Sequence, residues 1–183
     1  MKTRRLLWIV AGVLFAAASI AIHYEVKIGM HRGRGSVHAL GQLKVREPAP
    51  DFTLSDLEGR PVALSSFHGK KAVLIDFWAT WCAPCRASMP GLQELADDFR
   101  DQGFEVVALD QQESLDQVRS FMERRKYSLQ VLLDSNGAVG DIYGVRGLPT
   151  SVLVDKKGVV QAIFVGAFGD NEMRKQVESV TRE

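Results

Sequence analysis

The sequence predicts an α/β domain with a central mixed β-sheet that has helices on both faces. From residue 50 onward, short apolar runs alternate with longer segments of helical periodicity, a pattern typical of strands followed by helices. One of these runs, residues 72–77, is apolar on both faces, as a central parallel strand requires. The alternation ends in two strands joined by Asp155-Lys156-Lys157-Gly158, a hairpin signature, so an antiparallel pair is expected to complete the sheet.

The first half of the domain begins after Pro48-Ala49-Pro50, and turn residues at 56–59 separate its first two strands. The long amphipathic segment after the strand at 72–77 favours a helix, because Pro84 suits a first helical turn and Gly103 can end the helix. In chain order we expect strands at 52–54 and 62–64, a loop at 65–69, a strand at 72–77, a helix from Pro84 to about Arg100 and a strand at 104–109.

In the second half, Ser114 is expected to cap a helix, and Gln117 three residues later would complete a capping box. Gly144 is expected to stop a short helix. In chain order we expect a helix from Ser114 to about Arg125, a strand at 131–133, a helix at 138–143, strands at 151–154 and 159–165, and a final helix at 171–181.

The only two cysteines, Cys82 and Cys85, lie where the strand at 72–77 passes into the following helix. A helix N-terminus offers unpaired backbone N–H groups and the positive end of the macrodipole, and both favour thiolate over thiol. We therefore expect Cys82 to be the exposed nucleophile and Cys85, one turn into the helix, to be the buried partner that resolves a mixed disulfide. A structural zinc site would need four ligands, and the sequence has no second cysteine pair, so no metal is expected. An inert disulfide between the two cysteines is the other alternative, although so small a loop would give little entropic stabilisation.

Asp76 interrupts the apolar strand six residues before Cys82. Burial would raise the pKa of this carboxyl and make it a candidate proton acceptor for Cys85. A solvent-facing position at the end of the strand is the alternative, because the flanking residues Ile75 and Phe77 lie on the opposite face.

Two further features could shape a binding surface around the cysteines. A cis peptide bond before Pro149 would present the backbone of Leu148 to an extended substrate, whereas an ordinary trans turn would carry no function. Trp78 and Trp81 flank the cysteine motif, and at least one of them is expected to be partly exposed. The predicted substrate contacts are Trp78, Trp81, Ala83, Pro84 and Leu148.

Glu113 follows the strand that comes after the helix bearing Cys85. It is expected at the sheet edge where ligands bind to α/β sheets. Glu113 could therefore support the active site, or it could be a solvent-exposed acid at the start of a helix.

The N-terminal segment differs in charge from the rest of the chain. Residues 1–47 carry eight Lys or Arg and two Glu, a net charge of +6, whereas residues 48–183 carry fifteen basic and twenty acidic residues, a net charge of −5. A basic segment joined to an acidic domain suits an anionic membrane surface and disfavours nucleic acid as a partner.

Residues 1–22 are expected to anchor the protein in a membrane. Three basic residues precede seventeen uncharged, mostly apolar residues at 6–22, and as a helix these would span about 26 Å, near the minimum for crossing a bilayer. An uncleaved anchor is favoured over a cleaved signal peptide ending near Ser19-Ile20-Ala21. Residues 23–47 are expected to form a flexible stem before a folded domain at 48–183, and the histidines of that stem, whose geometry nothing fixes, are not expected to bind metal: His23, His31 and His38.

The segment from Phe77 to Cys85, Phe-Trp-Ala-Thr-Trp-Cys-Ala-Pro-Cys, resembles the active-site motif of the thioredoxin superfamily, and Gly147-Leu148-Pro149-Thr150 resembles its cis-proline loop. The segments at 49–54 and 112–121 resemble the membrane-anchored TlpA/ResA/DsbE branch, and the similarity covers roughly residues 47–180. This resemblance implies a thioredoxin fold with an N-terminal β-hairpin and a central insertion. It also implies an extracytoplasmic thiol-disulfide oxidoreductase that needs no cofactor.

The same resemblance implies partners. Proteins of this branch commonly receive electrons from a membrane dithiol carrier of the CcdA/DsbD type and reduce disulfides in exported proteins, often apocytochrome c before haem attachment. Ser88 departs from the branch, which usually has glutamate at this position, while Asp76 matches the buried aspartate of ordinary thioredoxins. These departures weaken the assignment to cytochrome c maturation, and general reduction of disulfides in exported proteins is the alternative. Glu113 resembles an acidic residue of the branch near its active site.

Two alternatives belong to other functional classes. Peroxiredoxin-like relatives share the N-terminal stretch of the domain, but their peroxidatic cysteine follows a threonine three residues upstream, and here that residue is Ala79. A non-catalytic, membrane-tethered adaptor with a thioredoxin fold is the second alternative. The intact pair of Cys82 and Cys85 and the loop at Pro149 argue against this adaptor.

Overall fold

The computed structural model describes residues 39–40, 43–167 and 170–182, all within a compact unit that spans Ser36–Glu183. The expected anchor at 1–22 and the three stem histidines lie outside the described residues. Among the residues that are described, no helix has the length and apolar character needed to cross a membrane.

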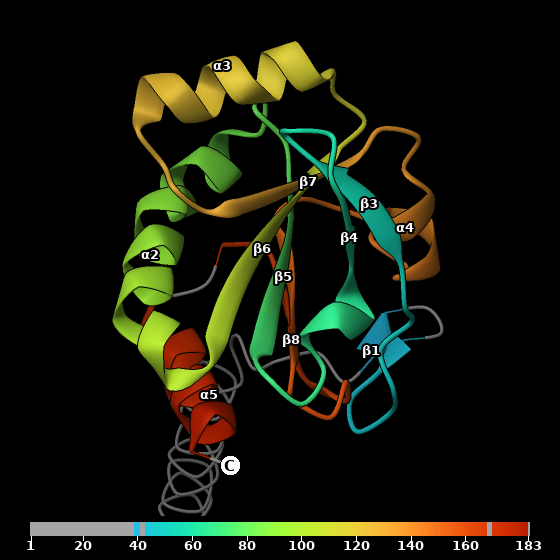
Figure 1. Cartoon of the computed structure of the whole chain (residues 1–183), viewed down its shortest axis with the longest axis vertical. Coiled ribbons are helices and arrows are strands. Elements are labelled where there is room, and N and C mark those ends of the chain that lie inside the picture. The colour runs from blue at the N-terminus through green and yellow to red at the C-terminus, as the bar shows by residue number, and fades with distance from the viewer. Residues whose placement is uncertain (1–38, 41–42, 168–169, 183) are drawn as a thin grey trace, which may run out of the picture. The chain divides into compact units, whose positions relative to one another are not determined.

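The described part of the chain forms a seven-stranded mixed sheet with the order β4-β3-β7-β6-β5-β8-β9 (Figure 1). The central strands β5, β6 and β7 are parallel to one another, and the outer strands are antiparallel to their neighbours. This arrangement confirms the predicted mixed sheet and terminal hairpin. The strands are β3 (Thr53–Asp56), β4 (Pro61–Ala63), β5 (Ala72–Trp78), β6 (Phe104–Gln111), β7 (Gln130–Asp134), β8 (Thr150–Val154) and β9 (Val160–Val165).

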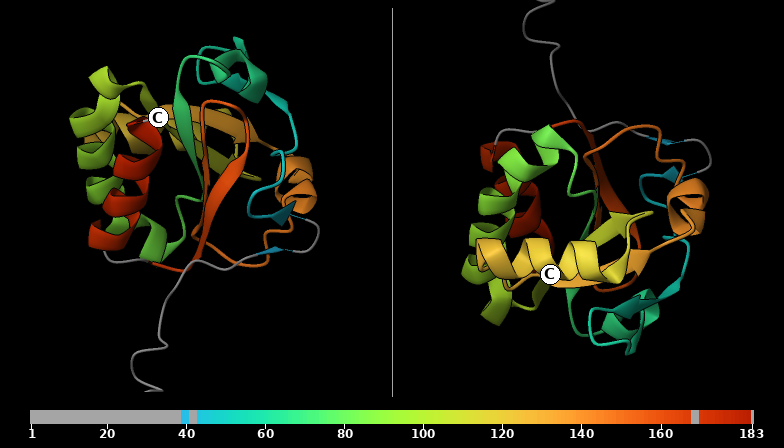
Figure 2. Two further views of the ribbon diagram at one scale, coloured as in Figure 1. Left: turned by 90° about the horizontal axis from the view of Figure 1, so that it is seen from below. Right: turned by 90° about the horizontal axis from the view of Figure 1, so that it is seen from above.

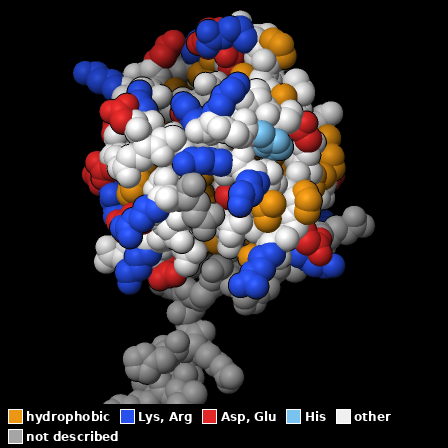
Figure 3. Space-filling view, turned by 60° about the horizontal axis from the view of Figure 1, so that its bottom comes forward, with side chains coloured by type: hydrophobic (Ala, Val, Ile, Leu, Met, Phe, Trp, Pro, Cys, Tyr) orange, Lys and Arg blue, Asp and Glu red, His pale blue; other side chains and the backbone are white. Residues whose placement is uncertain are grey.

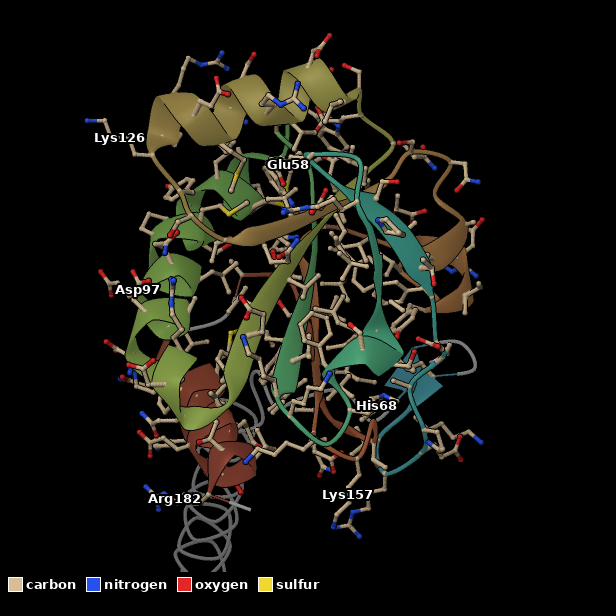
Figure 4. All side chains as sticks on the ribbon, in the orientation of Figure 1. Glu58, His68, Asp97, Lys126, Lys157 and Arg182 are labelled. Carbon is tan, nitrogen blue, oxygen red and sulfur yellow. A yellow bond between two sulfur atoms is a disulfide. The ribbon has the colours of Figure 1, made fainter. Side chains whose placement is uncertain are left out.

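Helices cover both faces of the sheet, as predicted (Figure 2). One apolar cluster joins a sheet face to α2 (Ala83–Phe99), α3 (Leu115–Arg125) and α5 (Asp170–Thr181). The other joins the opposite face to α4 (Ala138–Ile142) and the 3₁₀-helix η1 (Leu64–Phe67). The charged side chains of Asp97 on α2 and Lys126 after α3 point away from these clusters (Figure 4), as expected for helices with one apolar face.

The predicted N-terminal hairpin is confirmed by the antiparallel pairing of β3 with β4. The predicted loop at 65–69 is partly wrong, because η1 covers its first three residues. Leu64, the first residue of η1, is buried in the second apolar cluster. The chain reverses again at Gly103, whose φ of 74° is the left-handed conformation that glycine adopts most easily. The predicted end of the first long helix is therefore confirmed.

The expected stem is wrong in its last residues, which belong to the folded domain. A short ribbon of β1 (Ala39–Leu40) and β2 (Leu43–Lys44) precedes β3, and Leu43 is buried in the second apolar cluster. The Arg46 N–H donates to Val160 O at 2.7 Å, which pairs this segment with the start of β9. The apolar residues near Leu43 are too few and too irregularly spaced to give a periodic signal that would predict this contact.

The predicted capping box at the start of α3 is also wrong. Ser114 is the N-cap residue, but its side chain makes no capping hydrogen bond. The Gln117 side chain donates instead to Glu113 Oε1 at 2.6 Å. Gln117 therefore supports the residue that comes before the helix cap.

Tyr143 connects the end of α4 to the segment that enters the domain. It is fully buried, its ring lies 5.4 Å from Phe77, and its hydroxyl donates to Pro50 O at 2.7 Å. We expect Tyr143→Phe to lower the free energy of unfolding by about 1 kcal/mol, because the Pro50 carbonyl loses its partner. Urea unfolding tests this, with Tyr127→Phe as the control; an equal loss in both variants would contradict the role of this hydrogen bond.

The end of the molecule away from α3 carries basic and acidic side chains side by side (Figure 3). Some of these side chains form ion pairs, such as Lys71 Nζ with Glu105 Oε2 at 2.6 Å. This end therefore presents mixed charge, while the cysteines lie toward the opposite end of β5.

Candidate active site

The two cysteines lie at the junction between β5 and α2, as predicted. Cys82 is the N-cap residue of α2, and its sulfur accepts a hydrogen bond from the Cys85 backbone N–H at 3.3 Å. The structure contains the oxidised pair: Cys82 and Cys85 form a disulfide with a Cα–Cα distance of 5.3 Å. A sulfur in this position faces the unpaired N–H groups of the helix start, which stabilise a thiolate once the disulfide is reduced.

The expectation of an exposed Cys82 is wrong for the oxidised pair. Only 4% of Cys82 and 1% of Cys85 are exposed, because the sulfur of Cys82 is directed inward to its partner and to the first turn of α2. The surface beside the disulfide is formed by neighbouring residues. Trp81, Ala83 and Pro84 are all exposed, and Trp81 has 67% of its surface accessible.

Asp76 is buried on the face of β5 that packs against α2. Leu74 and Trp78 share this face and belong to the same apolar cluster, whereas Ile75 and Phe77 belong to the cluster on the other side. The solvent-facing alternative is therefore wrong, since Asp76 is only 1% exposed.

The chemistry of Asp76 follows from its surroundings. Ser151 Oγ donates to Asp76 Oδ1 at 2.6 Å, and Asp76 Oδ2 has no hydrogen-bond partner among the described residues. Burial raises the pKa of Asp76 to about 7, and the hydrogen bond from Ser151 opposes part of this rise. A carboxyl with such a pKa can take up and release a proton near neutral pH.

A small pocket of about 40 Å³ reaches Asp76 between α2, the β8–β9 pair and α5. Pro149, Ser151 and Ser88 also line it, and Ser88 Oγ donates to the Cys85 carbonyl at 2.9 Å instead of pointing freely into the pocket. The pocket is large enough for water, which gives the buried carboxyl of Asp76 a route for proton exchange.

The peptide bond between Leu148 and Pro149 is cis, which confirms the prediction for this loop. Thr150 pairs with Phe77 in the antiparallel β5–β8 ladder, so the loop lies at the end of β5 from which the chain continues to Cys82. Pro149 is buried and Leu148 is half-buried. The two segments whose sequence resembled the thioredoxin motif and its proline loop thus meet at one end of the sheet.

The two tryptophans have different environments. Trp81 is exposed beside the disulfide, which confirms that at least one of them reaches the surface. Trp78 is fully buried with its ring 5.4 Å from that of Phe121 on α3. Its predicted contact with a substrate is therefore wrong, because as the last residue of β5 it faces the apolar cluster under α3.

Glu113 is buried beside the active-site turn. Only 7% of it is exposed, so a solvated acid at a helix start is excluded. Its Oε2 accepts from the Thr80 N–H at 2.5 Å, and its Oε1 accepts from Thr80 Oγ1 at 2.6 Å and from Gln117 Nε2 at 2.6 Å. Glu113 thus contacts the chain two residues before Cys82.

Sequence reasoning missed three polar residues of this region. Asp110 is fully buried at the end of β6, and burial followed by the neighbouring Glu113 raises its pKa to about 8. Arg86 Nη1 donates to Thr80 O at 2.9 Å, and Ser151 contacts Asp76 across two strands. Asp110 could have been found by a criterion close to the one that identified Asp76, because it is an acid directly after the apolar run at 106–109.

Comparison with known proteins identifies the chain. The model of the AhpC/TSA family matches residues 45–163. The chain belongs to the AhpC/TSA family. Within it, the chain is 39% identical over 136 residues to the thiol-disulfide oxidoreductase ResA of Geobacillus thermodenitrificans, covering 74% of this chain and 78% of that protein. It is 32% identical over 181 residues to ResA of Bacillus cereus, covering 99% of each chain.

Solved structures support the same assignment. A crystal structure described as a thiol:disulfide interchange protein of the DsbE type from Chlorobium tepidum has a TM-score of 0.72 and 32% identity, covering 76% of this chain and 99% of that one. The chain therefore has the thioredoxin-like fold of the AhpC/TSA family. Together with the Cys82–Cys85 pair, these relatives make it an enzyme of the thiol-disulfide oxidoreductase class.

Proposed function

We propose that this protein is an extracytoplasmic reductase of disulfides in exported proteins, and that it acts by dithiol exchange through Cys82 and Cys85. The observation that carries the proposal is the position of the Cys82 sulfur as the N-cap of α2, where it accepts the Cys85 N–H. This position favours the thiolate of the reduced enzyme, and the thiolate is the attacking species in disulfide exchange.

The reaction requires two exchanges. The Cys82 thiolate attacks one sulfur of a substrate disulfide, the substrate S–S bond breaks, and the first substrate thiolate leaves. Cys85 then loses its proton to Asp76, and its thiolate attacks the Cys82 sulfur. The second substrate thiolate leaves, and the enzyme retains the disulfide seen in the structure. Two electrons pass from the enzyme to the substrate in each cycle.

The proposed location and electron donor rest on the sequence. The basic and apolar residues at 1–22 support a membrane anchor with the catalytic domain outside the cytoplasm. A membrane dithiol carrier of the CcdA/DsbD type would then reduce the Cys82–Cys85 disulfide after each turnover. Apocytochrome c is one candidate substrate. Other disulfide-bonded exported proteins are also candidates, because Ser88 and Asp76 differ from the residues usual in the branch.

Reduction of insulin by the full chain, with dithiothreitol as electron source, tests the reaction. We expect turnover by the wild type and none above the uncatalysed rate by Cys82→Ser, with the Ser88→Ala variant as a matched control that remains active. If the wild-type chain shows no turnover, the alternative of a non-catalytic adaptor is supported.

The location is tested separately in intact cells of the source organism. A membrane-impermeant maleimide should label reduced Cys82 without lysis, because the proposed domain faces the outside of the membrane. Labelling that requires lysis would place the cysteines on the cytoplasmic side and overturn the location while leaving the chemistry unchanged.

Trp81 is expected to contact protein substrates, because it is 67% exposed beside the disulfide. Large exposed aromatic side chains often dominate binding, so Trp81→Ala should raise the KM for a protein substrate about tenfold. The Cys82–Cys85 disulfide should still react with dithiothreitol at nearly the wild-type rate, and Trp81→Phe should retain most of the affinity. An unchanged KM in Trp81→Ala would remove Trp81 from the substrate surface.

A further inference from the structure

We infer that Glu113 is a positioning residue of the dithiol site, which together with Arg86 fixes Thr80 and, through the turn in which Thr80 lies, the sulfur of Cys82. This inference deepens the proposed function, because it concerns how the same enzyme keeps its attacking sulfur at the helix start. It rests on a set of hydrogen bonds that converge on one residue from two different elements.

Thr80 has all of its polar groups engaged. Its N–H and its hydroxyl donate to the two carboxylate oxygens of Glu113 at 2.5 and 2.6 Å, and its carbonyl accepts from Arg86 Nη1 at 2.9 Å. Glu113 comes from the segment between β6 and α3, and Arg86 comes from the first turn of α2. Thr80 is therefore hydrogen-bonded both to the segment between β6 and α3 and to α2.

The held residue lies inside the turn that delivers Cys82. The Cys82 N–H donates to Ala79 O at 3.1 Å, which closes a four-residue turn with Thr80 and Trp81 at its centre. Because Thr80 cannot rotate without breaking bonds to Glu113 and Arg86, the turn has a fixed orientation. The Cys82 sulfur is then directed at the Cys85 N–H, 3.3 Å away.

We call the set of Glu113, Thr80 and Arg86 the clamp, and it needs a residue at 113 whose two side-chain oxygens both accept hydrogen bonds. The three partners of the Glu113 oxygens, namely Thr80 N, Thr80 Oγ1 and Gln117 Nε2, all act as donors. An amide in place of the carboxylate would keep one acceptor oxygen and would direct an NH₂ group at another donor. Glu113→Gln is therefore disruptive although the two side chains have nearly the same shape.

Asp110 lies under Glu113 and keeps a proton near neutral pH. Asp110 Oδ1 accepts from the Glu113 N–H at 3.2 Å, and Oδ2 has no partner within the described residues. Burial raises the pKa of Asp110 to about 8, the side chain of Glu113 and then Asp134 on β7 add to this rise, and the hydrogen bond from the Glu113 N–H opposes part of it. The buried carboxyl of Asp110 thus lies next to Glu113, and the cation of Arg86 contacts Thr80 from another side.

A direct role for Glu113 in substrate contact does not fit its environment. The side chain is only 7% exposed, and each carboxylate oxygen already accepts from a partner inside the domain. Its effect on the reaction therefore passes through Thr80.

The test is the rate at which iodoacetamide alkylates Cys82 in the reduced full chain at pH 7, with full pH profiles for each variant. Two possible roles of Glu113 predict opposite changes in the alkylation rate of Cys82 when Glu113 is replaced by glutamine. If Glu113 acted only through its negative charge, removing the charge would favour the Cys82 thiolate and would accelerate alkylation. If Glu113 positions the turn, Glu113→Gln releases the sulfur from the helix N-terminus and slows alkylation, and we expect a decrease of at least about threefold.

A second pair of variants keeps the inference testable if Glu113→Gln fails to fold. Thr80→Val removes the hydroxyl that donates to Glu113 and changes no charge, so it should slow alkylation of Cys82 in the same direction, whereas Thr80→Ser keeps the hydroxyl and should retain most of the rate. Glu94→Gln, on the exposed side of α2, is the control and should match the wild type.

The outcomes separate this inference from the proposed function. Slower alkylation in Glu113→Gln and Thr80→Val supports the clamp. Wild-type or faster alkylation in these folded variants overturns the clamp but leaves dithiol exchange intact. If wild-type Cys82 itself reacts like an ordinary thiol, the proposed function fails before the variants are compared.

Discussion

Replacing Cys85 with alanine should convert the enzyme into a covalent trap for its substrates. The Cys82 thiolate of this variant can still attack a disulfide, but the residue that would break the mixed disulfide is missing. We expect turnover of insulin to fall to the uncatalysed rate, while a Cys82-linked adduct accumulates that is visible on non-reducing gels and in intact-mass spectra. Dithiothreitol should release the adduct.

The matched variant is Cys82→Ala, which retains Cys85 as its only thiol. Because Cys85 is the more deeply buried member of the pair at 1% exposure, this variant should form few or no adducts. Equal trapping by both variants would contradict the assignment of Cys82 as the attacking residue. Absence of trapping in Cys85→Ala would contradict the exchange mechanism itself.

Replacing Asp76 with asparagine should change both the pH dependence of stability and the rate of resolution. Burial raises the pKa of Asp76 from 3.8 to about 7 in the folded protein. When the pKa of a carboxyl is higher in the folded than in the unfolded protein, its full contribution to the free energy of unfolding is present at pH values below the unfolded pKa. This contribution is lost as the pH rises through the folded pKa. The wild type should therefore lose stability between about pH 4 and pH 7 through Asp76.

Asp76→Asn removes this loss because an amide does not ionise. A shift of about three pH units corresponds to an upper limit of about 4 kcal/mol, so the variant should gain up to this amount over the wild type at pH 8 and little at pH 4. Urea unfolding of the oxidised proteins at both pH values measures this difference. Asp97→Asn, on the exposed face of α2, should show no such dependence.

The same variant should slow the release of reduced substrate. Without the carboxylate to accept the proton of Cys85, resolution of the mixed disulfide should be slower from pH 6 to 9, a range chosen around the ordinary thiol pKa. Stopped-flow measurement of substrate release tests this. Kinetics identical to the wild type over this range would remove Asp76 from the mechanism.

Much of the fold could be predicted because its elements carry strong local signals. Residues 72–77 form a central strand since they are apolar on both faces, and Gly103 ends the first long helical segment since it can adopt a positive φ. The start of the domain was harder to predict. Leu43 contributes to the core from a stretch without strand or helix periodicity, and only its tertiary contacts show this.

The site was predictable where one residue broke a pattern. The cysteines are the only ones in the chain, and Asp76 is the only charge in its strand. Contacts between distant residues were not predictable, because the pairing of Ser151 with Asp76 depends on strand register across 75 residues. Asp110 was missed because the expected strand ended at residue 109, whereas β6 continues to Gln111.

The start of α2 makes Cys82 an easily ionised thiol, with Cys85 protected behind it. The most direct measurement is the pH dependence of carboxamidomethylation of each cysteine in the reduced full chain, resolved by peptide mass spectrometry. We predict that Cys82 reacts first, with an apparent pKa below the ordinary value of about 8.5, while Cys85 stays largely unmodified. Equal modification of both residues with an apparent pKa of about 8.5 would contradict the account.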